Sequence, residues 1–176
     1  MLIAFIVVAS IFSYTVLAAG FHFSGESHSV VRQGIRQAGS SCTVTGTVYG
    51  ISNSPKLLNY IIIPIGLTAG GEPIDITTVS VRIVGPGHTE VIPQNDPLID
   101  TFPESGCWSV QERHCSNADS LLETGECYIL NISPYNRYDL APHGTFAIEI
   151  KPAGRAALRV KRTIPGQIDR LTPLRG

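Results

Sequence analysis

The chain begins with an apolar run that no charged residue interrupts. Residues 2–21 read LIAFIVVASIFSYTVLAAGF, and the first acid and the first base of the chain are Glu26 and Arg32. About 20 apolar residues suffice for a helix to cross the hydrocarbon core of a bilayer. A helix that is apolar on every side must lie in lipid or pack against other helices. The run therefore predicts that this chain needs a membrane, copies of itself, or both in turn.

The residues after the run favour a longer helix. A cleaved secretory signal is disfavoured because no Lys or Arg precedes the run, which is also long for a signal. Beyond it, apolar and small residues recur at steps of three and four, with Glu26, Arg32 and Arg36 on the other side, as in an amphipathic helix. A simple membrane anchor does not explain this continuation. Since the first proline is Pro55, we predict one helix over residues 1 to about 40, roughly 60 Å long.

The large apolar side chains of the run are the candidate core of a polymer. They are Leu2, Ile3, Phe5, Ile6, Val7, Ile11, Phe12, Val16, Leu17 and Phe21. Small residues between them, such as Ala9, Ser13 and Gly20, would let neighbouring helices approach closely. The run is therefore expected to lie in lipid before assembly and in a helix bundle afterwards.

The rest of the chain changes to the period of two that strands show. Residues 60–67 (YIIIPIGL) form a short buried run in which Pro64 indicates an edge or a bulge. Proline and glycine punctuate residues 85–103. Other strands are predicted at residues 42–49, 74–84, 107–110, 127–132, 146–150 and 158–161. About seven short strands separated by turns indicate a β-sandwich. The predicted class is α+β, with a polymerisation helix at 1–40 and an outer β-sandwich domain at 41–176.

Charge is scarce and unevenly distributed. Charged residues make up 15% of the chain and the formal net charge is −1, so no overall field attracts nucleic acid. Residues 72–149 carry 12 acids and 3 bases, whereas residues 151–176 carry 7 bases and 1 acid. The charges can belong to solvated strand faces. Alternatively, the basic end of one subunit meets the acidic middle of the next and sets the register of a polymer.

Four cysteines and one sequon are candidate modification sites. An even number of cysteines in an exported chain favours disulfides among Cys42, Cys107, Cys115 and Cys127, although the sequence does not choose between the three possible pairings. Free thiols remain the alternative, and zinc fits less well because no Cys-x-x-Cys is present. Asn131 begins the one Asn-x-Ser/Thr sequon. Its glycosylation would require the side chain to face outward from a predicted strand.

No recognisable catalytic arrangement is present in the sequence. Cys107 or Cys115 with His114 or His143 matches no nucleophile motif. Neither a phosphate-binding loop nor a calcium loop of standard spacing occurs. We therefore expect no catalytic residue, no cofactor and no metal site, which makes an enzyme the weakest of the function classes.

Six segments, in this order, resemble a known family. They are LIAFIVVASIFSYTVLAAGFHFS (2–24), SVVRQGIRQA (29–38), GTVYG (46–50), LTAGGEPIDIT (67–77), FAIEIKPAG (146–154) and RVKRTIPGQID (159–169). Together they make nearly the whole chain similar to the archaellins, the archaeal flagellins. The resemblance implies a type IV pilin-like helix joined to an immunoglobulin-like sandwich.

The resemblance also implies a function. It predicts the structural subunit of the archaellum, an extracellular rotating motility filament that is a polymer of the chain itself. Its precursor would be embedded in the membrane, trimmed by a prepilin-type peptidase and passed to the archaellum assembly and motor machinery. In the family a basic leader and a cleavage site precede the apolar run, whereas Met1 here belongs to the run, so the processing site is not placed on this sequence. An adhesive type IV pilus-like filament and a membrane-tethered binding module are the alternatives.

Overall fold

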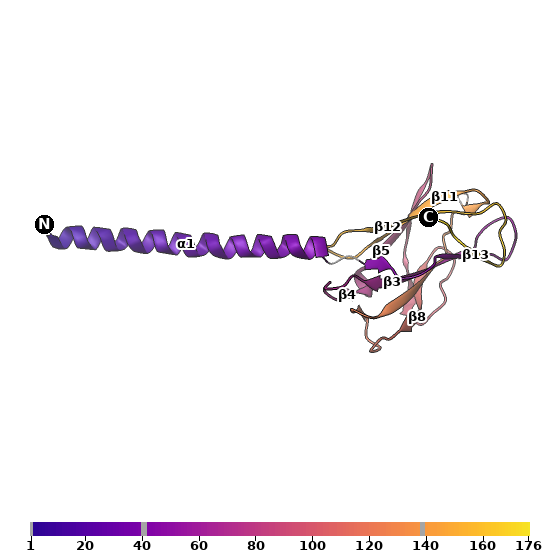
Figure 1. Ribbon diagram of the computed structural model, residues 1–176, viewed down its shortest axis with the longest axis horizontal. Coiled ribbons are helices and arrows are strands. Elements are labelled where there is room, and N and C mark those ends of the chain that lie inside the picture. Colours follow the sequence, from indigo (N-terminus) through magenta and orange to yellow (C-terminus); the bar gives the residue numbers. More distant parts are fainter. Residues whose placement is uncertain (1, 40–41, 138–139) are drawn as a thin grey trace. The chain divides into compact units, whose positions relative to one another are not determined.

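A single helix forms the N-terminal part of the chain. The computed structural model describes residues 2–39, 42–137 and 140–176, with the helix backbone alone for residues 25–39. α1 (Leu2–Gly39) is 38 residues long and has no interruption (Figure 1). The predicted long helix is therefore confirmed. Its predicted ends at residues 1 and 40, the domain division between residues 40 and 41, and the side chains of the amphipathic stripe beyond residue 24 lie outside the described residues.

Thirteen strands follow in the described residues, most of them in two larger sheets. The seven-stranded sheet has the order β13-β2-β3-β10-β8-β7, with β1 also paired to β3. Its members are β1 (Cys42–Val44), β2 (Tyr49–Ile51), β3 (Tyr60–Leu67), β7 (Gln94–Ile99), β8 (Trp108–His114), β10 (Cys127–Ile132) and β13 (Leu171–Pro173). The four-stranded sheet has the order β12-β11-β5-β6. Its members are β5 (Ser80–Val84), β6 (Thr89–Ile92), β11 (Thr145–Lys151) and β12 (Leu158–Thr163). A small third sheet joins β4 (Ile74–Asp75) to β9 (Leu121–Leu122).

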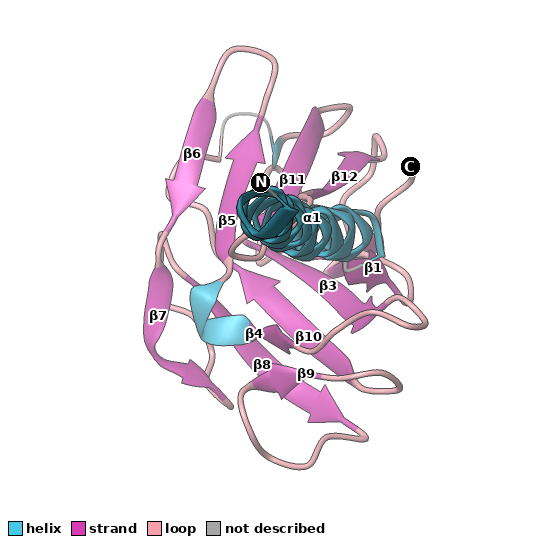
Figure 2. Cartoon of the chain, turned by 90° about the vertical axis from the view of Figure 1, so that its left-hand side faces the viewer, coloured by secondary structure: helices cyan, strands magenta, loops and turns pink. Residues whose placement is uncertain are grey.

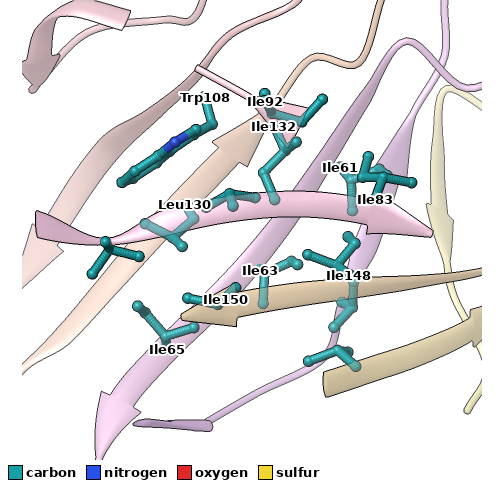
Figure 3. Close-up of a cluster of buried hydrophobic side chains, with 14 of the residues drawn as sticks. Ile61, Ile63, Ile65, Ile83, Ile92, Trp108, Leu130, Ile132, Ile148 and Ile150 are labelled. Atoms are coloured by element: carbon teal, nitrogen blue, oxygen red, sulfur yellow. The ribbon is translucent and has the colours of Figure 1, made fainter. Parts of the chain in front are cut away.

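The two larger sheets enclose one hydrophobic core. Figure 2 shows β5, β6, β11 and β12 grouped in one sheet and β3, β8 and β10 in the other. Alternate residues of β3, namely Ile61, Ile63 and Ile65, are buried and lie near Ile148 and Ile150 of β11 (Figure 3). This alternation follows from the period of two in a strand. The predicted fold class, a long N-terminal helix followed by a mostly antiparallel β-sandwich, is confirmed.

Pro64 lies in the middle of the sheet, so the predicted edge or bulge is wrong. β3 pairs with β10 on one side and with β1 and β2 on the other. Proline lacks the N–H that a ladder needs. The Pro64 carbonyl accepts a bond from the Thr45 N–H at 3.1 Å, and β2 resumes pairing only at Ile62. The missing donor therefore faces the gap between β1 and β2, where it interrupts no ladder bond.

The segment predicted as one strand over residues 74–84 is divided. A short 3-10 helix, η1 (Ile76–Thr78), separates β4 from β5. The Asp75 carboxylate accepts bonds from the Thr77 N–H at 3.0 Å and from the Thr77 hydroxyl at 2.7 Å. Such side-chain bonds to nearby backbone compete with a sheet ladder. Local polar chemistry thus breaks a stretch whose β-branched residues favour a strand.

Candidate functional site

The N-terminal helix presents a large apolar surface. All ten candidate core residues named above are exposed, with exposed fractions from 50% for Val7 to 79% for Ile3. Three further exposed side chains in the same run, Val8, Tyr14 and Phe23, belong to this surface although the sequence-based selection left them out. Since they lie in the same uninterrupted run, composition alone could have included them. We call residues 2–24 the apolar helix.

Two of the hydroxyl groups of the apolar helix are satisfied locally. The Ser10 hydroxyl donates to the Val7 carbonyl at 2.8 Å, and the Thr15 hydroxyl donates to the Phe12 carbonyl at 2.8 Å. Such bonds to the preceding turn remove the need for water around a hydroxyl group. Because backbone donors and acceptors of a helix also pair within it, the segment can enter an environment without water.

The length of the apolar helix fits a bilayer. The span Leu2–Ser24 covers 23 residues, and an 18-residue stretch within it has a mean hydropathy of 2.4 and is not buried within the chain. At ~1.5 Å per residue this span is about 34 Å long, close to the ~30 Å of a bilayer core. Its length and composition therefore make the apolar helix a candidate membrane span.

A shallow groove runs along one side of the apolar helix. It is lined by the small residues Ser13, Gly20 and Ser24 and by larger residues such as Phe12 and Phe21. A Cβ atom placed on Gly20 would meet nothing within 4 Å in the chain. Small residues at such positions let a second helix approach closely enough for van der Waals packing. The groove can therefore accept side chains of another helix.

All four cysteines are free thiols, so the structure does not contain the disulfides that their number predicted. Cys107 precedes β8 and Cys115 follows it, with the seven residues of that strand between them. Eight steps of ~3.3 Å place them roughly 26 Å apart. Disulfides join residues whose Cα atoms are only ~4.4–6.8 Å apart. These two cysteines therefore cannot pair within one subunit.

Cys42 and Cys127 flank β3 but face opposite sides of the sheet. Cys42 pairs with Leu67 and Cys127 with Gly66, and consecutive strand residues point to opposite faces. Burial raises the pKa of the Cys42 thiol to about 11, so it stays protonated and unreactive at neutral pH. The Cys127 sulfur lies 3.2 Å from the Thr45 hydroxyl on the other face. A bond between these two sulfur atoms would require the strands to rearrange.

Asn131 points to a covered part of the sheet, so its side chain lacks the exposure that glycosylation would require. Its exposed fraction is 0%, and its Nδ2 donates to Gln111 Oε1 at 3.0 Å. The segment after β7 covers this end of the sheet, where the Ser109 hydroxyl donates to the Thr101 carbonyl at 2.6 Å. Nδ2 is the atom that carries an N-linked glycan. The folded chain therefore does not offer Asn131 for glycosylation.

Charges from the two oppositely charged stretches already pair within one subunit. Glu149 of β11 forms ion pairs with Arg82 and with Arg159, the latter at 3.6 Å. Arg155 donates to the Glu72 carbonyl at 2.6 Å and lies 4.0 Å from the Glu72 carboxylate. Part of the basic C-terminal stretch is thus neutralised by its own chain. Fewer charges remain for contacts between subunits than the sequence suggested.

The cysteines and histidines considered for catalysis form no active site in the described residues. His114 Nε2 lies 3.5 Å from a Glu112 carboxylate oxygen, and both side chains are exposed. Among the described side chains, those of residues 2–24, 42–137 and 140–176, no three His, Cys, Asp or Glu residues are placed to hold a metal ion. Cys107 and Cys115 donate to no histidine in this part of the chain.

Comparison with known proteins agrees with these features. Residues 1–162 match the family model for archaeal-type flagellin. Probable flagellin 2 of Archaeoglobus fulgidus is 30% identical over 97% of this chain and 88% of its own length. Probable flagellin 1 of Aeropyrum pernix is 28% identical over 95% of this chain and 88% of its own.

Two solved structures share the fold. The archaeal flagellum of Methanospirillum hungatei strain JF1 superposes with a TM-score of 0.71 at 24% identity, covering 98% of this chain and 93% of that one. The flagellin FlaB1 of Methanocaldococcus jannaschii superposes with a TM-score of 0.61 at 14% identity, covering 77% of this chain and 96% of that one. The first match includes the long helix as well as the sandwich, because it spans nearly the whole chain.

Proposed function

This chain belongs to the archaeal-type flagellin family and is a structural subunit of the archaellum, and we propose that its copies polymerise through the apolar helix. The archaellum is an extracellular motility filament at the cell surface. Polymerisation would place the apolar helices of many copies together in the core and leave the β-sandwiches outside. The proposal rests on the exposed surface of the apolar helix.

The magnitude of that surface supports polymerisation. Moving one large apolar side chain from water to an apolar environment stabilises by roughly 1.5–3 kcal/mol. The ten candidate core side chains would together contribute on the order of 15–30 kcal/mol by the same measure. Association costs an estimated ~4–15 kcal/mol in lost translational and rotational freedom. The balance favours a helix bundle over helices exposed to water.

The same helix supports a membrane-embedded precursor. Between lipid and a helix bundle there is little hydrophobic difference, so close packing of small residues must favour the bundle. Ser13 and Gly20 supply such positions along the groove. We infer that the subunit resides in the bilayer through residues 2–24 until the archaellum assembly and motor machinery incorporates it. In cells that cannot assemble filaments, the subunit should remain in membranes after washing at alkaline pH.

A charge in the apolar helix tests the proposal. Ile6→Asp and Phe12→Asp would each bury an unpaired carboxylate in the core of a bundle, which is strongly unfavourable. We expect electron microscopy of cells carrying either variant to show no filaments. Val91→Asp is the control, because Val91 is exposed on β6 and lies outside the apolar helix.

A milder variant separates assembly from insertion. Phe12→Ala keeps the helix apolar, so the subunit should still enter the membrane. The lost contacts should lower the temperature at which filaments dissociate. Normal filaments from both aspartate variants, together with unchanged heat stability of Phe12→Ala filaments, would rule out the apolar helix as the polymerising element.

A further inference from the structure

At its β13 end, the outer face of the seven-stranded sheet is apolar where a solvent-facing sheet is normally polar. Strand pairing places Leu171, Ile51 and Tyr60 side by side across β13, β2 and β3. The next row along the same strands contains Pro173, Tyr49 and Ile62, and a third contains Pro64 and Ile129. We call these side chains, with Phe102, the apolar face. Phe102 joins it through an edge-to-face contact with Tyr60, at 4.7 Å between ring centroids.

The strand period shows that these residues point away from the core. Their neighbours along each strand are buried, as Gly50, Ile61, Ile63, Leu130 and Thr172 illustrate. Since consecutive strand residues face opposite sides, the residues between them face outward. Leu171 and Phe102 are 55% and 51% exposed. The rows at the β13 end therefore carry apolar side chains on both surfaces of the sheet.

The other sheet of the same sandwich is different. Its outward residues on β5, β11 and β12 include Arg82, Glu149, Lys151, Arg159 and Lys161. Such a face is suited to water. The outer face of this sheet is thus mainly polar, whereas the other sheet has an outer face that is apolar at its β13 end, and an exposed apolar patch is a candidate contact surface.

The apolar face also contains a groove. Ile51, Tyr60, Phe102 and Leu171 line it, together with the polar side chains of Asn53 and Arg170. An apolar floor with a few polar groups at its rim is the arrangement found at protein–protein contacts. The groove lies along the first row, where Phe102 contacts Tyr60.

We propose that the outer β domain of a second copy of this chain covers the apolar face in the filament. The inference rests on the proposed function, because the helix bundle must first bring the copies together. A helical polymer uses head-to-tail contacts, in which the apolar face meets a different surface of the neighbour. The apolar face of each subunit is then covered by one neighbour, and another surface of the same subunit covers the apolar face of the next neighbour.

The size of the face points to another copy rather than to a free protein. Three strand spacings of ~4.8 Å make it about 14 Å wide, and four residue steps of ~3.3 Å make it about 13 Å long. Stable two-body interfaces bury about 800 Å² on each partner, several times more than this footprint. A face this small gives useful binding only at the high local concentration that a linked site creates. The polymer supplies that concentration for its own subunits.

The charges at the two ends of the face also suit a head-to-tail neighbour. Exposed Arg170 precedes Leu171 at the β13 end of the first row. The third row continues from Ile129 to Glu112 of β8, whose side chain is exposed. The covering surface of the neighbour would therefore carry an acid opposite Arg170 and a base opposite Glu112. Such rim pairs contribute little energy but favour one orientation.

Hydroxyl-radical labelling read by mass spectrometry tests the inference on the wild-type chain. Filaments are compared with subunits dissociated in detergent. Phe102 and Leu171 should be labelled at least threefold less in filaments, while Val91, which is 69% exposed on the other sheet, should be labelled equally in both. Equal labelling of Phe102 and Leu171 in filaments and subunits would overturn the inference. Absence of filaments from the wild-type chain would instead contradict the proposed function.

A pair of matched variants provides the second readout. Leu171→Glu places a charge on the apolar face, and Val91→Glu places the same charge on an outward strand position of the other sheet. We expect Leu171→Glu filaments to dissociate at a clearly lower temperature than Val91→Glu filaments. Circular dichroism of dissociated subunits checks that both variants fold. Equal dissociation temperatures of two folded variants would show that no neighbour covers the apolar face.

Discussion

Ser133 is the sequon residue whose removal is most informative. Its hydroxyl is buried and has no hydrogen-bond partner in the described part of the chain. Leaving a buried hydroxyl unsatisfied costs about 1–3 kcal/mol. Ser133→Ala should therefore leave the free energy of unfolding of the subunit unchanged or raise it by about 1 kcal/mol, measured by denaturant unfolding. The backbone bond from the Ser133 N–H to the Cys107 carbonyl is retained in alanine.

The same variant decides whether Asn131 carries a glycan. Ser133→Ala destroys the sequon and leaves Asn131 in place. Because Asn131 is buried, we expect the intact masses of wild type and variant to differ by one oxygen atom alone. A larger loss of mass in the variant would mean that the glycan is attached before the strand is buried.

The environment of a single residue was predicted correctly where one effect, the hydrophobicity of its side chain and neighbours, decides it. The large apolar residues of the apolar helix are exposed, as their uninterrupted pattern indicated. Asn131 was different because its environment depends on the segment that crosses the outer face near Ser109, which lies 22 residues away in sequence. No local pattern of residues carries that information. The same limit applies to Cys107 and Cys115, whose separation is set by the length of β8.

At the scale of elements, the apolar helix contains Gly20 in its interior, where close packing between subunits would explain why a glycine is present. A Cβ atom on Gly20 would meet nothing within 4 Å in the described part of the subunit, and glycine in a helix interior costs about 0.5–1 kcal/mol relative to alanine. Gly20→Leu should therefore leave membrane insertion intact while filling the groove beside Ser13 and Phe21. We expect fewer filaments, with a lower dissociation temperature, and an intermediate result for Gly20→Ala.

The control for that prediction is a glycine in the β domain. Gly87 also has open space around it, and Gly87→Ala should leave both filament number and dissociation temperature unchanged. If Gly20→Leu filaments match those of Gly87→Ala in both respects, helices do not pack closely at Gly20. Immunoblots of membrane fractions establish that each variant is present at the wild-type level.

Strands with a strong periodic pattern were predicted from the sequence, whereas strands at the edges of the two larger sheets were missed. The run at 60–67 became β3, and 127–132 became β10. β6 and β7 were not predicted, because prolines and glycines interrupt the strand pattern of residues 85–103. β7 tolerates Pro97 because it lies at the edge of its sheet, where a missing donor breaks few bonds. It also runs parallel to β8, which makes it the exception to the predicted antiparallel pairing.

At the scale of the whole molecule, the two halves of the chain offer two different kinds of contact. The apolar helix can bury side chains on every side, whereas the sandwich offers one small apolar face. The first contact would hold the polymer together, and the second would fix the position of each outer domain relative to the next. Sequence composition predicted the first directly. The second became visible only when strand register showed which side chains share a row.

The balance of charged and apolar contacts predicts how filaments respond to salt. The sequence suggested that the basic C-terminal stretch of one subunit meets the acidic middle of another. If such pairs held the filament, 1 M NaCl would weaken it, since salt shortens the screening length from ~10 Å at 0.1 M to ~3 Å. In the structure, Glu149 and the Glu72 region already engage Arg159 and Arg155 within the subunit. The contacts proposed between subunits are mainly apolar.

Apolar contacts respond to salt in the opposite direction. Salts such as sodium sulfate are excluded from protein surfaces and strengthen the burial of apolar groups. We therefore expect the dissociation temperature of filaments, followed by light scattering, to be unchanged or higher in 1 M NaCl than in 0.1 M, and higher still in sodium sulfate. Because both salts screen exposed ion pairs, a fall in both would show that charge pairs hold the subunits together. In that case, the dissociation temperature of Lys161→Glu filaments would show whether Lys161 belongs to these charge pairs. The variant reverses a charge on the polar face and leaves the apolar helix and the apolar face unchanged.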